Sequence, residues 1–321
     1  EFAGYDFAAM GERVAAEVDG LTPVEVGPGS FPAGDPASLA PSTDHDPDDV
    51  RWYFYTSGTT ADPKGARHSD ATVGSFAVAV GDRLHIEPGD RYSLVFPFPH
   101  VGGVGLLLMA LHHGCCHLMD EGVDPVETVR FLSEQGCTHA GTATPFYLMY
   151  LAAQEKMSEP LFPDLKVCPG GGSPIPPAMH FRVKTELGGA GAASGWGLTE
   201  APTLTNCDLD DPDEKIATTE GRALPGVDLI AVADDETVCP PGVEGELRAK
   251  GPMVMKGYVD SSLDAAVFDA DGYVRTGDLG IIDAAGFVTI TGRLKDIIIR
   301  NAENISAKEV EDLLYLHDAI T

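Results

Sequence analysis

The sequence predicts an α/β fold in which a mainly parallel sheet is followed by a smaller antiparallel β region. Over residues 51–205, short β-prone runs alternate with helix-like runs, the order expected of strands joined by crossover helices. After about Asn206, short strand-like runs are separated by Asp- and Gly-rich turns instead, which is typical of an antiparallel meander or small barrel. We therefore expect a large unit over residues 1–293, divided into 51–205 and 206–293, and a separate segment over 294–321.

The expected strands of the first part are short apolar runs, and the expected helices lie between them. The strands are predicted at 51–57, 92–98, 115–119, 138–143, 165–171 and 192–197. The helices are predicted at 74–86, 104–113, 124–136, 145–157 and 177–189. The first fifty residues are poor in pattern, and residues 27–49 are rich in Pro, Gly, Ser and Asp, so we expect a long surface connection there.

The helix at 124–136 can be argued residue by residue. Asp124 is a good N-cap, Pro125 suits the first turn, and Glu127 completes a capping box. Gly136 can end the helix. Three apolar residues have the spacing of one buried face, namely Val126, Val129 and Leu132. At the other end of the chain, Ser306 and Glu309 form a second capping box and predict a helix there.

Composition excludes several classes of protein. The formal net charge of -29 opposes binding to nucleic acid or to anionic membrane, because both require a basic surface. No apolar run approaches the length of a transmembrane helix, and the N-terminal residues lack the plan of a signal peptide. The six cysteines form no C-x-x-C pair, so we expect free thiols and a cytoplasmic protein. Cys115 and Cys116 are expected to pack in a buried strand.

The segment YFYTSGTTADPKGARHSD, residues 53–70, has the features of a phosphate-binding loop. A strand ending at Tyr55 would deliver hydroxyl groups and backbone N–H groups to the carboxyl edge of the sheet. Gly58 allows close approach to a ligand, and Lys64 adds a mobile cation. The spacing is not that of G-x-x-x-x-G-K-[ST], and a solvent-exposed Ser/Thr/Gly loop explains the composition equally well.

The segment YTSGTTADPKG, residues 55–65, resembles the signature loop of the adenylate-forming superfamily, which contains acyl-CoA and aryl-CoA synthetases, adenylation domains and luciferases. Four further segments match in the superfamily's order: FPFPHVGG at 96–103, GWGLTEA at 195–201, GYVDSSLDAAVFDADGYVRTGDLG at 257–280 and GRLKDIIIRNAENISAKEVEDLL at 292–314. The resemblance departs from the usual pattern at Ala61, Trp196 and Ala302, where glycine, tyrosine and glycine are usual.

The resemblance implies a role for each matching residue. Trp196 would line adenine, and Asp278 would accept hydrogen bonds from both ribose hydroxyls. Thr199 would bind the α-phosphate of ATP, and Glu200 would hold Mg²⁺. Arg293 would contact ribose and phosphate. Each residue also has a non-functional explanation. Trp196 could simply pack in the core, and the charged residues could lie on the surface or in turns.

The loop and its neighbours complete the predicted site. The residues over the β- and γ-phosphates would be Thr56, Ser57, Gly58, Thr59, Thr60 and Lys64. The nucleotide would also contact Gly170, Gly171, Gly172 and Gly197. The residues expected to act in catalysis are Lys64, Thr199, Glu200 and Arg293, because an attack of anion on anion requires neutralised charge.

The acid to be activated would lie beside FPHVGG, where no carboxylate is available to pair with an amino group. That absence argues against an amino-acid substrate. The expected acyl-pocket residues are His100, Val101, Gly102, Gly141, Thr142 and Gly170. The segment looks like that of bacterial medium-chain or cyclic-carboxylate CoA ligases.

The predicted activity is therefore an acyl-CoA synthetase that uses ATP, Mg²⁺, a carboxylic acid and CoA, and a homodimer is possible. A fatty-acyl-AMP ligase that loads a carrier protein and a non-catalytic nucleotide-binding relative remain alternatives. Lys295 matches the superfamily's hinge, and no second lysine motif follows it. We expect the chain to be a fragment that binds nucleotide and adenylates poorly.

Overall fold

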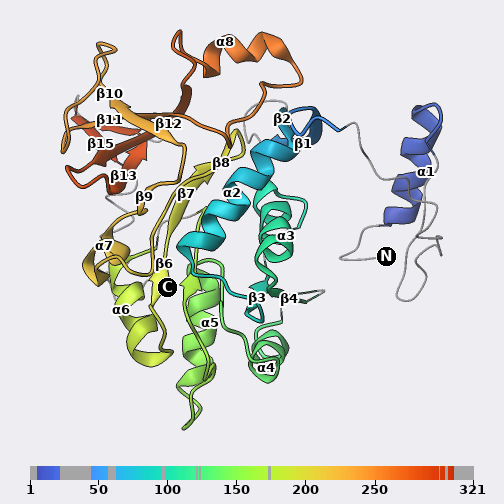
Figure 1. Ribbon diagram of the computed structural model, residues 1–321, viewed down its shortest axis with the longest axis vertical. Coiled ribbons are helices and arrows are strands. Elements are labelled where there is room, and N and C mark those ends of the chain that lie inside the picture. Colours follow the sequence, from blue (N-terminus) through green and yellow to red (C-terminus); the bar gives the residue numbers. More distant parts are fainter. Residues whose placement is uncertain are drawn as a thin grey trace. The chain divides into compact units, whose positions relative to one another are not determined.

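The computed structural model (Figure 1) describes residues 6–21, 45–56, 63–95, 98–120, 122, 124–172, 175–295, 297–300 and 303–306. The chain forms two compact units, Glu1–His45 and Asp46–Thr321. The first unit contains helix α1 (Phe7–Glu17), which the Asp6 carboxylate caps. The sequence pattern does not predict this helix, and most of the surface connection expected at 27–49 lies outside the described residues. The boundaries expected at 205/206 and 293/294 stay predictions.

A parallel strand array forms the centre of the second unit, as the alternating sequence pattern predicts. Strand β3 (Arg91–Leu94) pairs in parallel with β4 (Cys116–Met119), and β5 (Cys168–Pro169) with β6 (Ala192–Ala193). Single parallel bridges join β3 to His139, and His139 to the residue before β5. The array therefore runs in the order β4, β3, His139, β5, β6.

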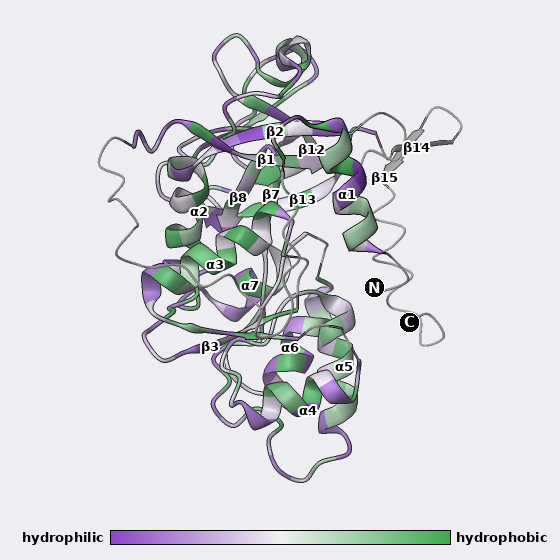
Figure 2. Cartoon of the chain, turned by 90° about the vertical axis from the view of Figure 1, so that its right-hand side faces the viewer, coloured by the Kyte–Doolittle hydropathy of each residue, from purple (hydrophilic) through white to green (hydrophobic). Residues whose placement is uncertain are grey.

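Helices cover both faces of this array. They are α2 (Asp70–Arg83), α3 (Val101–His113), α4 (Glu127–Glu134), α5 (Thr144–Gln154) and α6 (Pro177–Glu186). One buried cluster contains Phe76 of α2 and Val104 of α3, and a second contains Leu132, Tyr150 and Val183 of α4, α5 and α6. Figure 2 shows apolar colouring along α3, in keeping with its sequence VGGVGLLLMALHH. Within the described part of the chain, no helix has the length and apolarity needed to cross a bilayer.

The detailed predictions for two segments need correction. Asp124 does accept hydrogen bonds from the backbone at the start of α4, but Thr128, not Glu127, bonds back to the Asp124 N–H. Val126 precedes the helix and is exposed, so the buried face is formed without it. All six cysteines are free, but Cys116 is exposed, so the expectation that it packs in a buried strand is wrong.

Antiparallel hairpins carry several of the segments on which the site predictions fall. Strand β1 (Val50–Thr56) pairs with β2 (Lys64–Ser69), so the phosphate-loop segment joins two strands of a hairpin. The expectation that β1 ends at the carboxyl edge of the parallel sheet is wrong, because a β-prone run alone does not specify its partner. Strands β7 (Gly195–Leu198), β8 (Ala201–Asn206) and β9 (Arg222–Ala223) form a second antiparallel sheet.

The C-terminal half is antiparallel, as predicted. Strands β10 (Asp228–Val232), β11 (Glu244–Lys250), β12 (Val274–Ile282) and β13 (Val288–Arg293) form one sheet in chain order. Short helices precede or interrupt it, namely α7 (Asp213–Thr218), η2 (Ser261–Leu263) and α8 (Asp264–Val267). A further hairpin joins β14 (Ile297–Arg300) to β15 (Glu303–Ser306). The helix predicted after Ser306 lies outside the described residues.

Candidate functional site

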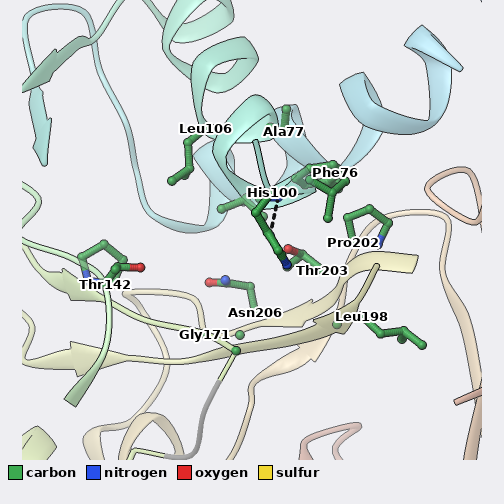
Figure 3. Close-up of a pocket in the computed structure, with 18 of the residues that line it drawn as sticks. Phe76, Ala77, His100, Leu106, Thr142, Gly171, Leu198, Pro202, Thr203 and Asn206 are labelled. Atoms are coloured by element: carbon green, nitrogen blue, oxygen red, sulfur yellow. Dashed lines mark hydrogen bonds between the residues drawn. The ribbon is translucent and has the colours of Figure 1, made fainter. Parts of the chain in front are cut away.

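A cavity of about 400 Å³ is bordered by helices α2 and α3 on one side and the β7–β8 hairpin on the other (Figure 3). One part of its wall is apolar and is formed by Phe76, Ala77, Val80, Leu84, Val101, Gly105, Leu106 and Met109. The other part is polar or glycine-rich and includes Thr56, Thr142, Gly170, Gly171, Gly172, Gly197, Thr199, Glu200 and Arg293. A cavity of this size with few, grouped polar residues is typical of a small-molecule site.

The tip of the β7–β8 hairpin presents Thr199 and Glu200 to the cavity. Leu198 pairs with Ala201, so these two residues form a two-residue turn. Both of their carbonyl groups are held: His68 Nε2 lies 2.9 Å from the Thr199 oxygen, and the Met255 N–H donates to the Glu200 oxygen at 2.8 Å. The backbone of the turn is thereby fixed, and its two side chains are presented from a defined position.

Glu200 is also held through its side chain. The Tyr258 hydroxyl donates a hydrogen bond to Glu200 Oε1, which leaves Oε2 for another partner. Burial and the adjacent carboxylate raise the pKa of Tyr258, so its hydroxyl stays a donor at neutral pH. Lys64 Nζ lies 5.6 Å from the centre of the Tyr258 ring. The hairpin register places Lys64 directly opposite Thr56.

Lys64 therefore stands next to the cavity rather than in its lining, beside the hydrogen-bonded Tyr258–Glu200 pair. Thr56 reaches the lining itself. The other predicted loop residues, Ser57, Gly58, Thr59 and Thr60, lie outside the described part of the chain.

His68 is a buried residue that connects this site to helix α2. Its Nδ1 lies 3.1 Å from Thr72 Oγ1, and its Nε2 faces the Thr199 carbonyl. A carbonyl oxygen only accepts, so the proton of the neutral ring belongs on Nε2. Burial lowers the pKa of His68 from 6.5 to about 4, and the ring is therefore neutral at pH 7.

His68 is expected to make the chain less stable in mildly acidic solution. The folded pKa of about 4 lies below the unfolded value of 6.5, so the unfolded chain binds the proton more tightly. The stability contributed by His68 is complete above pH 6.5 and is lost as the pH falls towards 4. Between pH 7 and pH 5 the expected loss in free energy of unfolding is roughly 2 kcal/mol. Urea unfolding at both pH values measures it, and a His68→Gln variant should lose less over this range. An equal loss in that variant would refute the assignment.

The predicted adenine and ribose residues are joined to each other. Trp196 Nε1 donates to Asp278 Oδ2 at 2.8 Å, and Arg293 Nε donates to Asp278 Oδ1 at 2.8 Å. Asp278 lies opposite Arg293 in the β12–β13 pairing and is only 4% exposed. Each carboxylate oxygen can accept two hydrogen bonds, so one position on each oxygen remains for a ligand. Arg293 belongs to the cavity lining, whereas Trp196 and Asp278 do not.

Three of the predicted acyl-pocket residues, His100, Val101 and Gly102, lie at the N-terminus of α3. His100 caps this helix, because its Nδ1 accepts from the Gly102 N–H at 3.0 Å. Its ring extends towards Thr203 across the cavity (Figure 3). Burial lowers the pKa of His100, which favours a neutral ring at pH 7. Val101 and Gly102 also line the cavity.

The remaining predicted residues take different positions. Thr142 and the glycines at 170–172 line the cavity, and Gly141 lies one residue outside the lining. Gly172 has φ of +77°, a backbone conformation that side-chain-bearing residues rarely adopt. Lys295 is exposed, and its predicted hinge role stays a prediction.

No sequence motif marks the apolar half of the cavity. Helix α2 contributes Phe76, Ala77 and Val80, and α3 contributes Leu106 and Met109. The apolar run of α3 is visible in the sequence, but an apolar helix is normally part of the core. Only the structure shows that residues of α2 and α3 line a cavity together with the β7–β8 hairpin. Tyr258 and His68 were also not identifiable in advance, because their roles depend on contacts with residues far away in the chain.

Three comparisons with known proteins agree on the family of this chain. The family model described as AMP-binding enzyme matches residues 9–259. The medium-chain fatty-acid–CoA ligase of Escherichia coli (strain K12) is 34% identical over 276 residues, covering 85% of this chain and 48% of that protein. The chain thus spans about half the length of the curated relatives it matches.

Solved structures resemble the fold closely. O-succinylbenzoate coenzyme A synthetase (MenE) from Bacillus subtilis in complex with AMP has a TM-score of 0.75 and 25% identity, covering 86% of this chain and 56% of its own. ATP-bound MatB from Rhodopseudomonas palustris has a TM-score of 0.74 and 27% identity, covering 87% and 54%.

Proposed function

Because the chain belongs to the family of AMP-binding enzymes, we propose that it carries the nucleotide and carboxylate site of an acyl-CoA synthetase. The observation that carries this proposal is a single cavity with an apolar part and a polar part. The apolar part suits the chain of a carboxylic acid. The polar part contains Thr199, Glu200 and Arg293, groups suited to bind phosphate and its counter-ion.

The proposed reaction has two steps. An oxygen of the carboxylate attacks the α-phosphorus of ATP, the bond to the β-phosphate oxygen breaks, and pyrophosphate leaves. The thiol of CoA then attacks the acyl carbon, loses its proton, and AMP leaves. The first step brings two anions together, so most of the protein's contribution is positioning and charge neutralisation.

We assign the residues of this chain as follows. Thr199 donates to the α-phosphate, and Arg293 contacts phosphate and ribose. Lys64 and the loop beginning at Thr56 face the β- and γ-phosphates. Asp278 uses its remaining acceptor positions for the ribose hydroxyls, with Trp196 beside adenine.

Glu200 fits the predicted magnesium ion. Carboxylate oxygen is a ligand that Mg²⁺ prefers, and Oε2 is left when Tyr258 bonds Oε1. When bound, the ion neutralises phosphate charge. The acid-binding end and CoA as acceptor are supported by the CoA ligases to which the chain is similar, whose names describe different acids.

Replacing Glu200 by Gln is expected to weaken ATP binding in the presence of Mg²⁺ by at least about tenfold, since the amide carries no charge for the ion. AMP binding without Mg²⁺ should change less. Calorimetry on the chain measures both, and Glu214→Gln on helix α7 is the control. Equal Mg²⁺-dependent binding by the wild-type chain and the Glu200 variant would contradict the assignment.

Turnover is tested in the whole protein with ATP, Mg²⁺ and a mixed panel of fatty, cyclic and aromatic acids, with and without CoA. Mass spectrometry should detect an acyl-CoA only when CoA is present. An acyl-AMP that accumulates and does not respond to CoA would favour carrier-protein loading instead. No ATP-dependent product from any acid would contradict the proposal.

A further inference from the structure

A polar side chain in the cavity lining has a hydrogen-bonding group without a partner. Asn206, the last residue of β8, is 5% exposed. Its Oδ1 is buried, and among the described residues none bonds to it. An unpaired buried amide group costs about 1–3 kcal/mol, so a residue retained in this state calls for an explanation.

The position of Asn206 is tightly determined. Its backbone pairs with Gly195 on one side and Arg222 on the other, so it lies in the central strand of its sheet. The amide lies over Gly195, where a Cβ atom would come within 2.4 Å of Asn206 Nδ2. The Asn206 amide therefore occupies space that is available only because Gly195 has no side chain. Figure 3 shows the side chain directed into the cavity, towards Thr142 and below Leu106.

The chemistry around Asn206 defines what could pair with it. Much of the facing wall comes from apolar residues of α2 and α3, such as Phe76 and Leu106. The cation of the lining, Arg293, is engaged with Asp278 at the polar part of the cavity. A neutral amide beside apolar groups suits an uncharged hydrogen-bonding partner, not a second carboxylate.

We propose that Asn206 recognises a hydroxyl group carried on the chain of the carboxylic acid, away from the carboxylate. This inference rests on the proposed function and narrows it to hydroxylated acids. A hydroxyl can donate to Oδ1, and it can accept from Nδ2 if the amide is turned over, so either orientation is satisfied. An acid without the hydroxyl would leave Oδ1 unpaired and would bind about tenfold or more weakly.

The test compares straight-chain acids that carry one hydroxyl, moved along the chain, with the unsubstituted acid of the same length. Each is titrated into the chain by calorimetry, with and without AMP. At least one hydroxyl position should improve affinity about tenfold. Asn206→Leu should remove this preference without lowering the free energy of unfolding. If Asn206→Leu does not fold, Asn206→Ala is measured in place of the leucine variant.

A matched control is available on the same strand. Thr205 is fully buried, and its Oγ1 also has no partner among the described residues, but it does not line the cavity. Thr205→Val should keep the preference for the hydroxylated acid. Equal affinity within every acid pair, or a preference that survives in Asn206→Leu, would overturn the inference. If AMP does not bind, the proposed function is contradicted. The acid pairs are also titrated without AMP, so the preference for the hydroxylated acid is judged separately from nucleotide binding.

Discussion

Replacing Asp278 by Ala is expected to abolish measurable AMP binding and to destabilise the chain. The Asp278 carboxylate is buried and accepts from Trp196 Nε1 and Arg293 Nε. Alanine would remove the proposed ribose contact and leave the indole N–H of Trp196 without its partner. A buried donor left unpaired costs about 1–3 kcal/mol. Calorimetry with AMP and urea unfolding measure the two effects.

A conservative variant separates these effects. Asp278→Asn keeps an acceptor for Trp196, so its free energy of unfolding should stay nearer to that of the wild type, while AMP binds at least about tenfold more weakly. Asp235→Ala, on an exposed turn outside the cavity lining, should leave AMP affinity unchanged. AMP affinity within twofold of the wild type in Asp278→Ala would rule out the ribose assignment.

Replacing Gly197 by Ala should disrupt the β7–β8 hairpin. A Cβ atom at Gly197 would come within 2.2 Å of the Thr203 backbone nitrogen and 2.9 Å of the Ala201 carbonyl oxygen. These are backbone atoms of the paired strand, so the two strands would have to separate. Overpacking of this kind costs about 1–3 kcal/mol or more, and it would displace the hairpin turn. We expect a lower free energy of unfolding together with loss of AMP binding.

Gly74 offers the matched control for this variant. It lies inside helix α2, and no atom stands within 4 Å of the position its Cβ would take. Gly74→Ala should therefore raise the free energy of unfolding by about 0.5–1 kcal/mol, because alanine favours the helix, and AMP affinity should not change. If Gly197→Ala is as stable as Gly74→Ala in urea unfolding, a side chain at Gly197 does not force the β7–β8 strands apart, and this prediction is contradicted.

Local signals in the sequence predict much of the fold. The alternation of β-prone and helix-like runs predicts the parallel array, and the Asp/Gly turns after Asn206 predict the antiparallel sheet. Strand partners are less predictable, since pairing is a long-range property. Strand β1 has the composition of a buried parallel strand, yet it pairs with β2 across the loop. Val126 has helical spacing but lies before the first turn of α4, where nothing covers it.

The residues of the candidate site also fall into two groups, those that the sequence predicts and those that it does not. Motif residues such as Thr199, Glu200 and Arg293 can be named from the sequence, and the structure brings them to one cavity. The residues that hold them cannot be named in this way. His68 and Tyr258 acquire their roles from Thr199 and Glu200, which lie 131 and 58 positions away in the chain. Asn206 carries no motif at all, and it is distinguished only by an unpartnered buried Oδ1 together with its place in the cavity lining.

The central claim is that the chain binds the nucleotide and the acid together, with the acid and the phosphate end of the nucleotide in one cavity. The most direct measurement is the affinity of the chain for a non-hydrolysable acyl-adenylate analogue, an acyl sulfamoyl adenosine, compared with its affinity for AMP. If both ends of the cavity are occupied together, the analogue should bind at least about a hundredfold more tightly than AMP, since apolar burial adds roughly 0.8 kcal/mol per buried methylene group. An analogue that binds no more tightly than AMP would contradict the account.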